Sequence, residues 1–471
     1  MKSIHTRLAT AGGAALALAL VMTGCASTPD TPDKSDSNSA SGDQVVLSVV
    51  GLKAGSTDEA YKGLAEQVAT FEADNPGIKI VTRDYEWKAT TFAADLAGGT
   101  LPDVFEIPFT DSKTLAANGQ IADMNDYLDQ FPYGGAFNES VLQYGTGADG
   151  HVYAIPAKSI YASGLHYNRD LFTKAGLDPD KPPTTWDELR SAAKAISDAT
   201  GEAGFCQMAA NNTGGWQLTV DTFARGGSVE SVAADGKATA TTDNAATKAS
   251  LEFLKALRWE DNSMGANFTL DWGSINQAFA AGQCGMYTSG QDVYVSLVQA
   301  NDMDPAIYGL GMIPLEGDGA GLLGGGTLAA VNTNATDAQK EAAVKWISYY
   351  YLDRYSSEEA AVANAKLTLA NNQPVGVPEL PIFSKEDYDK YTQWIEPYVN
   401  VPLDQMKPFI DGIESAPLIN EPPVATQDVY AAMEPAVQAV LTDENADIDA
   451  LLAEANTTAQ RAIDKAQTAE Q

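Results

Sequence analysis

Cysteine and histidine are scarce in this chain of 471 residues. Three of each occur: Cys25, Cys206, Cys284, His5, His151 and His166. His151 and His166 are fifteen positions apart with no cysteine near either, so a zinc site of the usual ligand spacing cannot be assembled locally. The catalytic motifs G-x-S-x-G and H-E-x-x-H are also missing. We therefore expect no metal, no cofactor and no catalytic residue.

Positively charged residues are also few. The 29 Lys and Arg stand against 63 Asp and Glu, and the formal net charge is −34. A field of that sign repels phosphate backbones and anionic headgroups, which argues against a nucleic-acid partner. It also weakly disfavours an anionic small ligand, although a contribution to solubility explains most of the acidity better.

The N-terminal apolar run, Ala11–Val21, is well short of the ~20 residues that a membrane span requires. It follows Lys2 and Arg7 and ends in Val21-Met-Thr-Gly-Cys25, which resembles a bacterial lipobox. The sequence therefore predicts a lipoprotein signal peptide at residues 1–24 and an acylated Cys25, which anchors the protein to the outer face of the cell membrane. Plain secretory cleavage that leaves a free thiol is the alternative.

Residues 25–43 are predicted to be a disordered tether. The stretch Ala26–Asp43 contains no apolar residue larger than alanine, so it cannot bury a core. A flexible segment of this length has a mean span of roughly 25 Å. Such a tether would hold a domain off the membrane while leaving it free to reorient.

From Gln44 onward, strand-like and helix-like stretches alternate. The apolar runs VVLSVV, IKIV and PDVFEI are separated by helical patterns at Thr57–Ala73 and Ala89–Leu96. This alternation predicts an α/β fold with a mainly parallel sheet and helices on both faces. Ligands of such sheets bind beyond the carboxyl ends of the strands. The candidates at those ends are Lys53, Glu86, Trp87, Glu106 and Phe109.

The stretch Asp149–Ile196 carries a family resemblance. It contains DGHVYAIP, where Pro156 is expected to end a strand, then YNRDLFTKAGL, then PTTWDEL, where Thr185 and Glu188 form a capping box. With FEADNPGIKI, GGTLPDVFEI, GQIADM and AFAAGQCGMYTSG in the same order along the chain, it resembles the family 1 extracellular solute-binding proteins of ABC importers, the class of maltose-binding protein.

The resemblance implies a two-lobed periplasmic-binding-protein-like fold, each lobe a mainly parallel sheet flanked by helices, joined by hinge crossings. Residues 44–158 plus 327–370 would form the N-terminal lobe, and residues 159–326 plus 371–471 the C-terminal lobe. The return crossings are expected at Gly324–Ala330 and near Asn371–Gly376. Strands of the second lobe are expected at Ser163–Tyr167, Gly204–Met208 and Gly285–Thr288.

Aromatic residues suggest where a ligand binds, since sugars stack on flat rings while polar groups pair their hydroxyls. Asn211 and Trp216 lie in a glycine-loosened stretch that we interpret as a loop beside a cleft, although a core role for Trp216 is the alternative. Tyr161 falls at the first crossing. Further candidates are Gln291 and Asp292 after a strand, and Gly325 and Gly326, where a ligand could approach the backbone. Trp186, Trp259 and Trp346 have core spacing, and Trp272 fits either role.

Cys206 and Cys284 lie in two predicted strands of one lobe, so a disulfide is a hypothesis and two buried thiols are the alternative. Two motifs are excluded as functional. The G-x-G-x-x-G spelling at Gly319–Gly324 does not open a helix. The calcium-loop spelling from Asp443 has Ile448 where a glycine is needed.

These observations predict a surface-anchored, monomeric solute-binding component of an ABC importer. It would capture a neutral carbohydrate, an oligosaccharide, in a cleft between the lobes by hinge closure and deliver it to the permease. The rival from another class is a secreted glycoside hydrolase, because a catalytic pair among the 63 acids is not excluded by sequence. Within the binding class, a polyol, a peptide or a phosphorylated ligand remains an alternative.

Overall fold

The computed structural model of this chain describes residues 44–52, 58–85, 89–233 and 236–469. Asp43–Gln471 form one compact unit. The predicted leader and tether, Cys25, Lys53, Glu86 and Trp87 lie outside the described residues.

One mixed sheet of eight strands runs through this unit in the order β2-β1-β3-β9-β4-β7, with β10 beside β9 and β8 beside β4. Strands β1 (Val45–Val50), β2 (Ile78–Arg83) and β3 (Val104–Pro108) are parallel. The helices α1 (Asp58–Asp74) and α2 (Ala89–Ala97) connect them. This part has the β-α-β-α-β arrangement that the sequence predicted, and the α/β class is confirmed.

The rest of the sheet is largely antiparallel, which corrects the expectation of a mainly parallel sheet in each lobe. Strands β4 (Ala154–Asn168) and β9 (Leu322–Val331) pair antiparallel, and β7 (Met286–Gly290) and β8 (Tyr308–Gly311) both run antiparallel to β4. Only β10 (Leu418–Asn420) is parallel to its neighbour β9. The direction of β4 and β9 follows from topology, because one carries the chain away from the first core and the other brings it back.

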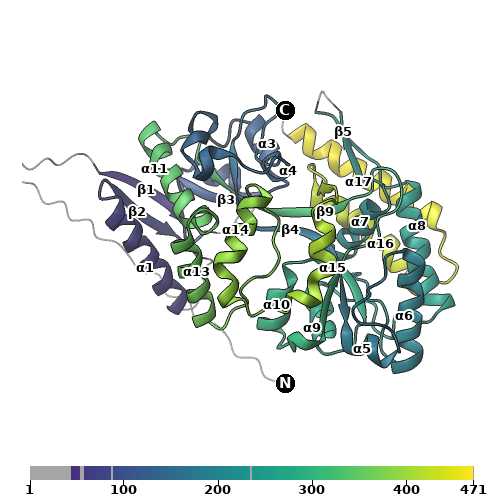
Figure 1. Ribbon diagram of the computed structural model, residues 1–471. Helices are drawn as coiled ribbons and strands as arrows, with labels where there is room; N and C mark the ends of the chain where they lie inside the picture. The colour runs from purple at the N-terminus through teal and green to yellow at the C-terminus, as the bar shows by residue number, and fades with distance from the viewer. Residues whose placement is uncertain (1–43, 53–57, 86–88, 234–235, 470–471) are drawn as a thin grey trace, which may run out of the picture. The chain divides into compact units, whose positions relative to one another are not determined.

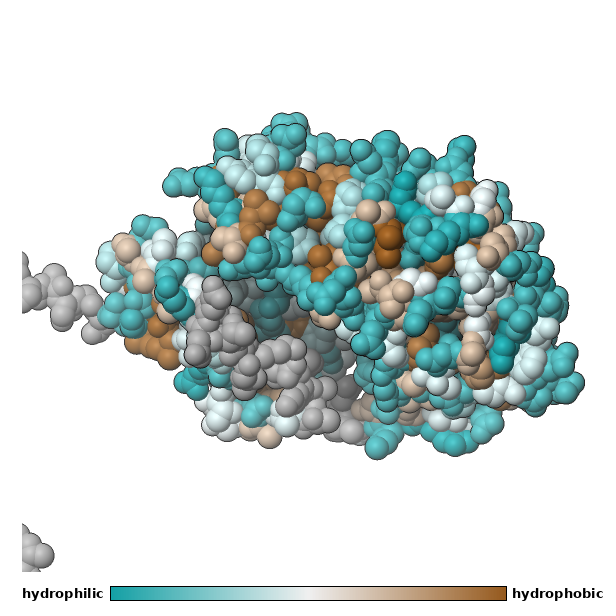
Figure 2. Space-filling view, turned by 90° about the horizontal axis from the view of Figure 1, so that it is seen from below, coloured by the Kyte–Doolittle hydropathy of each residue, from teal (hydrophilic) through white to brown (hydrophobic). Residues whose placement is uncertain are grey.

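Two separate hydrophobic cores flank the long strands. The first takes its buried residues from Leu47–Ile160 and Leu328–Ile395, and the second takes its residues from Ala162–Leu323 and Val401–Ile463. We call the parts of the chain around them the first and second lobes. The chain therefore changes cores at Tyr161 and again within β9. The face in Figure 2 is mostly hydrophilic and is hollowed near its middle.

The third passage is not completed near Asn371–Gly376. The chain turns there, after α13 (Glu358–Ala370), and Val377 packs against the second core, but Tyr391 and Ile395 still pack in the first core. The passage falls between Ile395 and Val401, because the amphipathic helix α14 (Lys385–Ile395) buries its apolar face against the first core before the chain leaves it.

Helices cover both parts of the sheet (Figure 1). Those of the first lobe are α3 (Ser112–Ala117), α4 (Glu139–Leu142), α11 (Asp337–Ile347) and α12 (Asp353–Ser356), besides those already given. Those of the second lobe are α5 (Arg169–Lys174), α6 (Trp186–Thr200), α7 (Thr213–Ala224), α8 (Ala245–Lys255), α9 (Trp272–Ala280), α10 (Val293–Ala300), α15 (Leu403–Ile413), α16 (Thr426–Thr442) and α17 (Ile448–Ala469). A small hairpin, β5 (Glu230–Val232) and β6 (Ala238–Ala240), lies apart from the main sheet.

Two local predictions need correction. Pro156 does not end a strand: it pairs with Leu328 inside β4, and the register shifts directly after it, which is how a strand tolerates a residue that cannot donate. Gly204–Met208 is not a strand: an isolated bridge forms at Met208, and another at Ala203 just before this stretch. Cys206 nevertheless lies beside β7 and is joined to Cys284 by a disulfide, with the two Cα atoms 6.0 Å apart.

Within the described residues, no helix combines the length and apolar character needed to cross a membrane. The same residues contain no group of three or more His, Cys, Asp or Glu that could hold a metal ion.

Candidate ligand-binding site

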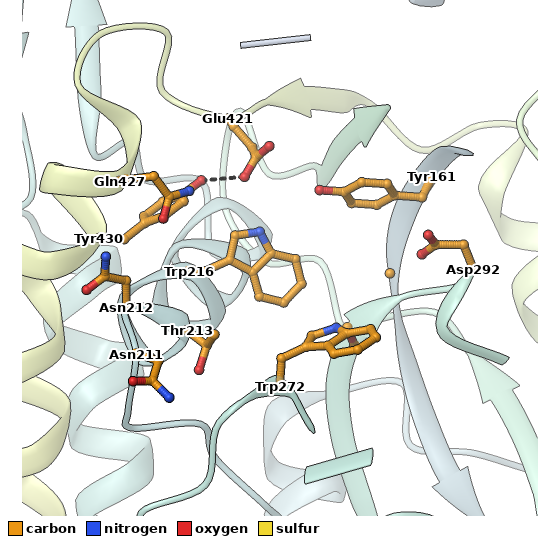
Figure 3. Close-up of a pocket in the computed structure, with 12 residues that line it drawn as sticks. Tyr161, Asn211, Asn212, Thr213, Trp216, Trp272, Asp292, Glu421, Gln427 and Tyr430 are labelled. Carbon is orange, nitrogen blue, oxygen red and sulfur yellow. Dashed lines mark hydrogen bonds between the residues drawn. The ribbon is translucent and has the colours of Figure 1, made fainter. Parts of the chain in front are cut away.

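A pocket of about 320 Å³ lies where the second lobe meets the first passage between the cores (Figure 3). Its lining comes from the crossing residue of β4, the start of α7, the start of α9, the end of β7 and the segment from β10 into α16. The lining residues are Tyr161, Asn211, Asn212, Thr213, Trp216, Trp272, Ser289, Gly290, Asp292, Glu421, Gln427 and Tyr430. All belong to the second lobe or to the crossing itself.

Trp216 is held in the pocket by the first turn of α7, so the prediction that it lies on a loop is wrong. Asn211 and Asn212 have φ of 59° and 67°, a conformation that asparagine tolerates better than most residues. The chain can therefore turn sharply into the helix. A Cβ on Gly215 would lie 2.0 Å from the Tyr430 carbonyl oxygen, so only glycine lets α7 and α16 approach this closely. That approach brings Trp216 and Tyr430 into one wall.

Trp272 is the most exposed large aromatic residue in the lining, with 46% of its surface accessible. It is the first residue of α9, directly after the N-cap Asp271, whose Oδ1 accepts from the Ser274 amide at 2.9 Å. The other carboxylate oxygen of Asp271 accepts from Asn211 Nδ2 at 2.9 Å. The cap therefore fixes two walls of the pocket relative to each other. The structure places Trp272, which the sequence left undecided, in the lining.

Glu421 is a pocket residue that the sequence reading missed. It follows β10, and its Oε1 accepts from the Tyr430 hydroxyl at 2.8 Å. Burial raises the pKa of Glu421, while hydrogen bonds from Tyr430 and Trp216 partly offset the rise. Its signal was weak: a single acid between the short run Leu-Ile-Asn and Pro422–Pro423.

Asp292 lines the pocket beside Tyr161. A Cβ on Gly290 would lie 2.5 Å from Asp292 Oδ1 and 3.0 Å from the Tyr161 ring, so glycine is required for the carboxylate and the ring to share this corner. The Asp292 residue is exposed to the open pocket, yet the protein packed around it partly desolvates the carboxylate, which raises the pKa of Asp292 to about 6. With Glu421, the pocket has two carboxylates, and its lining among the described residues includes no Lys, Arg or His.

Gln291 and the two glycines of β9 are not available to a ligand in the way we expected. The Gln291 side chain is 2% exposed, and it hydrogen-bonds the backbone rather than facing the pocket. A Cβ on Gly325 would lie 2.4 Å from the Tyr161 hydroxyl, so the Tyr161 ring already occupies the space over that glycine. The Gly326 carbonyl accepts from the Phe109 amide at 3.1 Å. All three residues therefore make contacts within the crossing segments rather than with a ligand.

The first-lobe candidates do not line the pocket either. Phe109 is 2% exposed and stacks on Tyr144 at 4.6 Å between ring centroids, because β3 ends inside the first core. Glu106 Oε1 accepts from Lys158 Nζ at 2.7 Å and from the Tyr351 hydroxyl at 2.8 Å. Its carboxylate is therefore already paired with neighbouring side chains.

The three tryptophans predicted to be core residues differ. Trp186 and Trp346 are buried, at 7% and 0% exposed. Trp259 is only half-buried, and its Nε1 donates to the Val440 carbonyl, near the end of α16, at 2.8 Å.

Two cores, long strands that pass between them and a pocket at the crossing define a two-lobed α/β binding-protein fold. Solved structures have the same fold. The cyclic alpha-maltosyl-1,6-maltose binding protein of Arthrobacter globiformis superposes with a TM-score of 0.68 at 23% identity, covering 90% of this chain and 100% of that one. An ABC substrate-binding protein of Listeria monocytogenes, solved in complex with cycloalternan, gives 0.65 at 21% identity, covering 89% and 99%.

Residues 54–356 match the family model of the bacterial extracellular solute-binding proteins, and the chain belongs to that family. Members are binding proteins, which confirms the expectation of a binding protein over an enzyme. A curated relative is the sn-glycerol-3-phosphate-binding periplasmic protein of Escherichia coli (strain K12), 28% identical over 269 residues. That alignment spans 53% of this chain and 57% of the relative.

Proposed function

We propose that this chain captures a neutral carbohydrate, an oligosaccharide, in the pocket described above and delivers it to the permease of an ABC importer. The observation that carries the proposal is the composition of the pocket. Four aromatic side chains, Tyr161, Trp216, Trp272 and Tyr430, share one lining with amides and carboxylates. This is the combination that a polyhydroxylated ligand needs.

The chemistry follows from the two kinds of surface on a sugar. Its C–H faces are apolar and stack on flat rings, and the exposed ring of Trp272 offers such a face. Its hydroxyls must be paired once they leave water, since an unsatisfied buried hydroxyl costs about 1–3 kcal/mol. The acceptors for them would be Asp292 and Glu421, and the amides of Asn211 and Gln427 can both donate and accept.

The pocket is one-sided, which supports a mechanism of closure. Every lining residue belongs to the second lobe or the crossing, so a ligand held there would have its other face uncovered. Rotation about the crossings β4 and β9 would bring the first lobe over that face and bury the ligand. The closed form would then be the one that the permease recognises.

A phosphorylated ligand, as bound by the E. coli relative, is disfavoured by the charge of the pocket. An anion would face the carboxylates of Asp292 and Glu421 with no described cationic lining residue to pair it. At about 4 Å, each like-charge contact costs roughly 1–4 kcal/mol.

The location of the protein in the cell is also a proposal, since it rests on the sequence Val21-Met-Thr-Gly-Cys25. The protein would be a monomer anchored outside the cell membrane by lipid on Cys25. The variant Cys25→Ala should move from the membrane fraction to the medium. Continued sedimentation with membranes would remove the anchor from the proposal.

Calorimetric titration tests the ligand class. The panel is linear and cyclic α-glucans, chitin oligosaccharides, ribitol and glycerol 3-phosphate. We expect micromolar or tighter binding of at least one neutral oligosaccharide, its recovery intact after overnight incubation, and no heat from glycerol 3-phosphate. Tight binding of glycerol 3-phosphate alone would overturn the proposal, and cleavage of the glycan would favour the hydrolase.

A further inference from the structure

The buried side chain of Gln291, the first residue after β7, contacts the backbone on both sides of the first passage between the cores. Its Oε1 accepts from the Ala162 amide at 2.8 Å, and its Nε2 donates to the Ile160 carbonyl at 3.3 Å. Ile160 belongs to the first core and Ala162 to the second. One amide group therefore spans the point where the chain changes lobes.

The same side chain reaches the extended stretch before α14. Gln291 Nε2 also donates to the Pro378 carbonyl at 3.4 Å. This stretch runs between the cores: Val375 and Ile382 belong to the first core, and Val377 packs against the second. The Gln291 backbone amide donates to the Ala162 carbonyl at 3.1 Å, which fixes the residue itself to the second-lobe side. Gln291 thus joins the first passage to a second stretch that contacts both cores.

The residues beside this amide line the pocket. Tyr161 lies between Ile160 and Ala162, and Asp292 follows Gln291 directly. Figure 3 shows the Asp292 carboxylate near the Tyr161 ring. A ligand that displaced either side chain would act one residue away from the hydrogen bonds that span the passage.

We propose that Gln291 is a positioning residue: it sets the resting arrangement of the two lobes and transmits ligand contact at Tyr161 and Asp292 to their closure. The closure itself is part of the proposed function. A buried amide that loses its partners is costly, so the lobe arrangement that keeps all three contacts is favoured. A ligand that favours another arrangement shifts the population only by the difference in its affinity for the two.

The chain offers a matched control in Gln217. This side chain is 0% exposed and also makes three hydrogen bonds. It accepts from the Met208 amide at 2.7 Å, and it donates to the Cys206 carbonyl at 3.3 Å and to Thr288 Oγ1 at 3.2 Å. All of its partners lie in the second lobe. Removal of either amide leaves a similar set of unpaired groups, but only Gln291 spans the passage.

The test measures interlobe distance without ligand, by pulsed electron paramagnetic resonance on the compact unit 43–471. Spin labels go on Lys62→Cys in α1 and Glu252→Cys in α8, two exposed positions, one in each lobe. The cysteines of this unit are joined to each other, so labelling is selective. Gln291→Met should change the ratio of distance populations on the order of fivefold, the equivalent of one net hydrogen bond. Gln217→Met should lower the melting temperature and leave the distances unchanged.

Unchanged distances in Gln291→Met, or equal changes in both variants, would overturn the proposal. Should Gln291→Met not fold, Gln291→Asn replaces it, because the shorter amide cannot span all three contacts. If neither folds while Gln217→Met does, Gln291 is a requirement of the fold and the proposal falls. The result needs no sugar, so it stands apart from the glycan titrations that test the proposed function.

Discussion

Two tryptophans, one in each lobe, are packed in opposite ways. In the first lobe, Trp346 is fully buried, stacked on Tyr350 at 5.1 Å and edge-on to Phe71 at 5.2 Å between centroids. In the second lobe, Trp272 leaves 46% of its surface in the solvent. The difference comes from position on the helix: Trp346 lies near the end of α11, surrounded by the core, and Trp272 is the first residue of α9, at the rim of a pocket. Burying an aromatic ring in a core contributes to the free energy of folding. An exposed ring makes little such contribution, and a ligand can instead bury its apolar surface on binding.

Truncation of the buried ring should give the largest effect. Trp346→Ala leaves a cavity among Phe71 and Tyr350 and should lower the free energy of unfolding by about 3–5 kcal/mol. The folded protein should bind its glycan with unchanged affinity. Urea unfolding and calorimetry measure the two quantities. A cost under about 1 kcal/mol would mean that the first core closes over the gap.

The disulfide is a second difference between the lobes, since the described cysteines both lie in the second lobe. Cys206 and Cys284 close a loop of 78 residues, and the Cys206→Ser, Cys284→Ser double variant should lose about 2–4 kcal/mol of stability. Intact mass before and after reduction should differ by two hydrogens. Free thiols that titrate in the folded, unreduced protein would show that the bridge does not form.

The pocket tryptophans should reverse the pattern of Trp346. Trp272→Ala should weaken glycan binding by roughly thirtyfold or more and change stability by no more than about 0.5 kcal/mol, because the ring is exposed. Trp216→Ala should lose similar affinity together with some stability, since its ring packs partly on the second core.

The control for these variants is Trp259→Ala. This half-buried ring lies outside the pocket lining and donates to Val440, so its loss should lower stability and leave affinity intact. Equal affinity losses in all three variants would show that the pocket responds to general loosening of the second lobe rather than to lost ring contacts.

How far the sequence predicts this molecule depends on whether a feature is local. Helix limits come from caps and periodicity in neighbouring residues. Thr185 accepts from the Glu188 amide at 3.1 Å, which is half of the predicted capping box, while the Glu188 carboxylate accepts from Thr184. Helix α6 begins at the residue after Thr185. The passages between the cores are not local features, and the expectation for them came from the family resemblance rather than from any pattern in neighbouring residues. The third passage is completed further along the chain than expected, because only packing decides which core the amphipathic helix α14 covers.

The site was predicted in part for the same reason. Tyr161, Asn211, Trp216 and Asp292 line the pocket. The last three are marked by neighbouring glycine, asparagine or a strand end, whereas Tyr161 was a candidate because the resemblance put the first crossing there. Glu421 and Tyr430 belong to a segment some two hundred residues further along the chain than Asn211 and Trp216. No local sequence pattern predicts that these two segments line the same pocket. Phe109 and Gly325 met the rule for strand ends and backbone approach, but protein side chains already fill those positions.

The smallest expected effect concerns the acidic side of the pocket. Limited hydration raises the pKa of Asp292 from 3.8 to about 6, so the folded protein holds that proton to a higher pH than the unfolded chain does. The contribution of Asp292 to stability therefore falls as pH rises from about 4 to 6. Ligand affinity should move in the opposite direction, because only the carboxylate accepts hydroxyl donors at both oxygens. Between pH 5 and 7.5 the affinity for the tightest glycan should rise by about three- to tenfold, and Asp292→Asn should flatten that rise. Asp443→Asn, at the C-terminal cap of α16 and outside the pocket lining, serves as the control for net charge. Opposite signs for stability and affinity separate this effect from general unfolding, and an affinity that stays level or falls with pH in the parent protein would remove Asp292 from the set of acceptors.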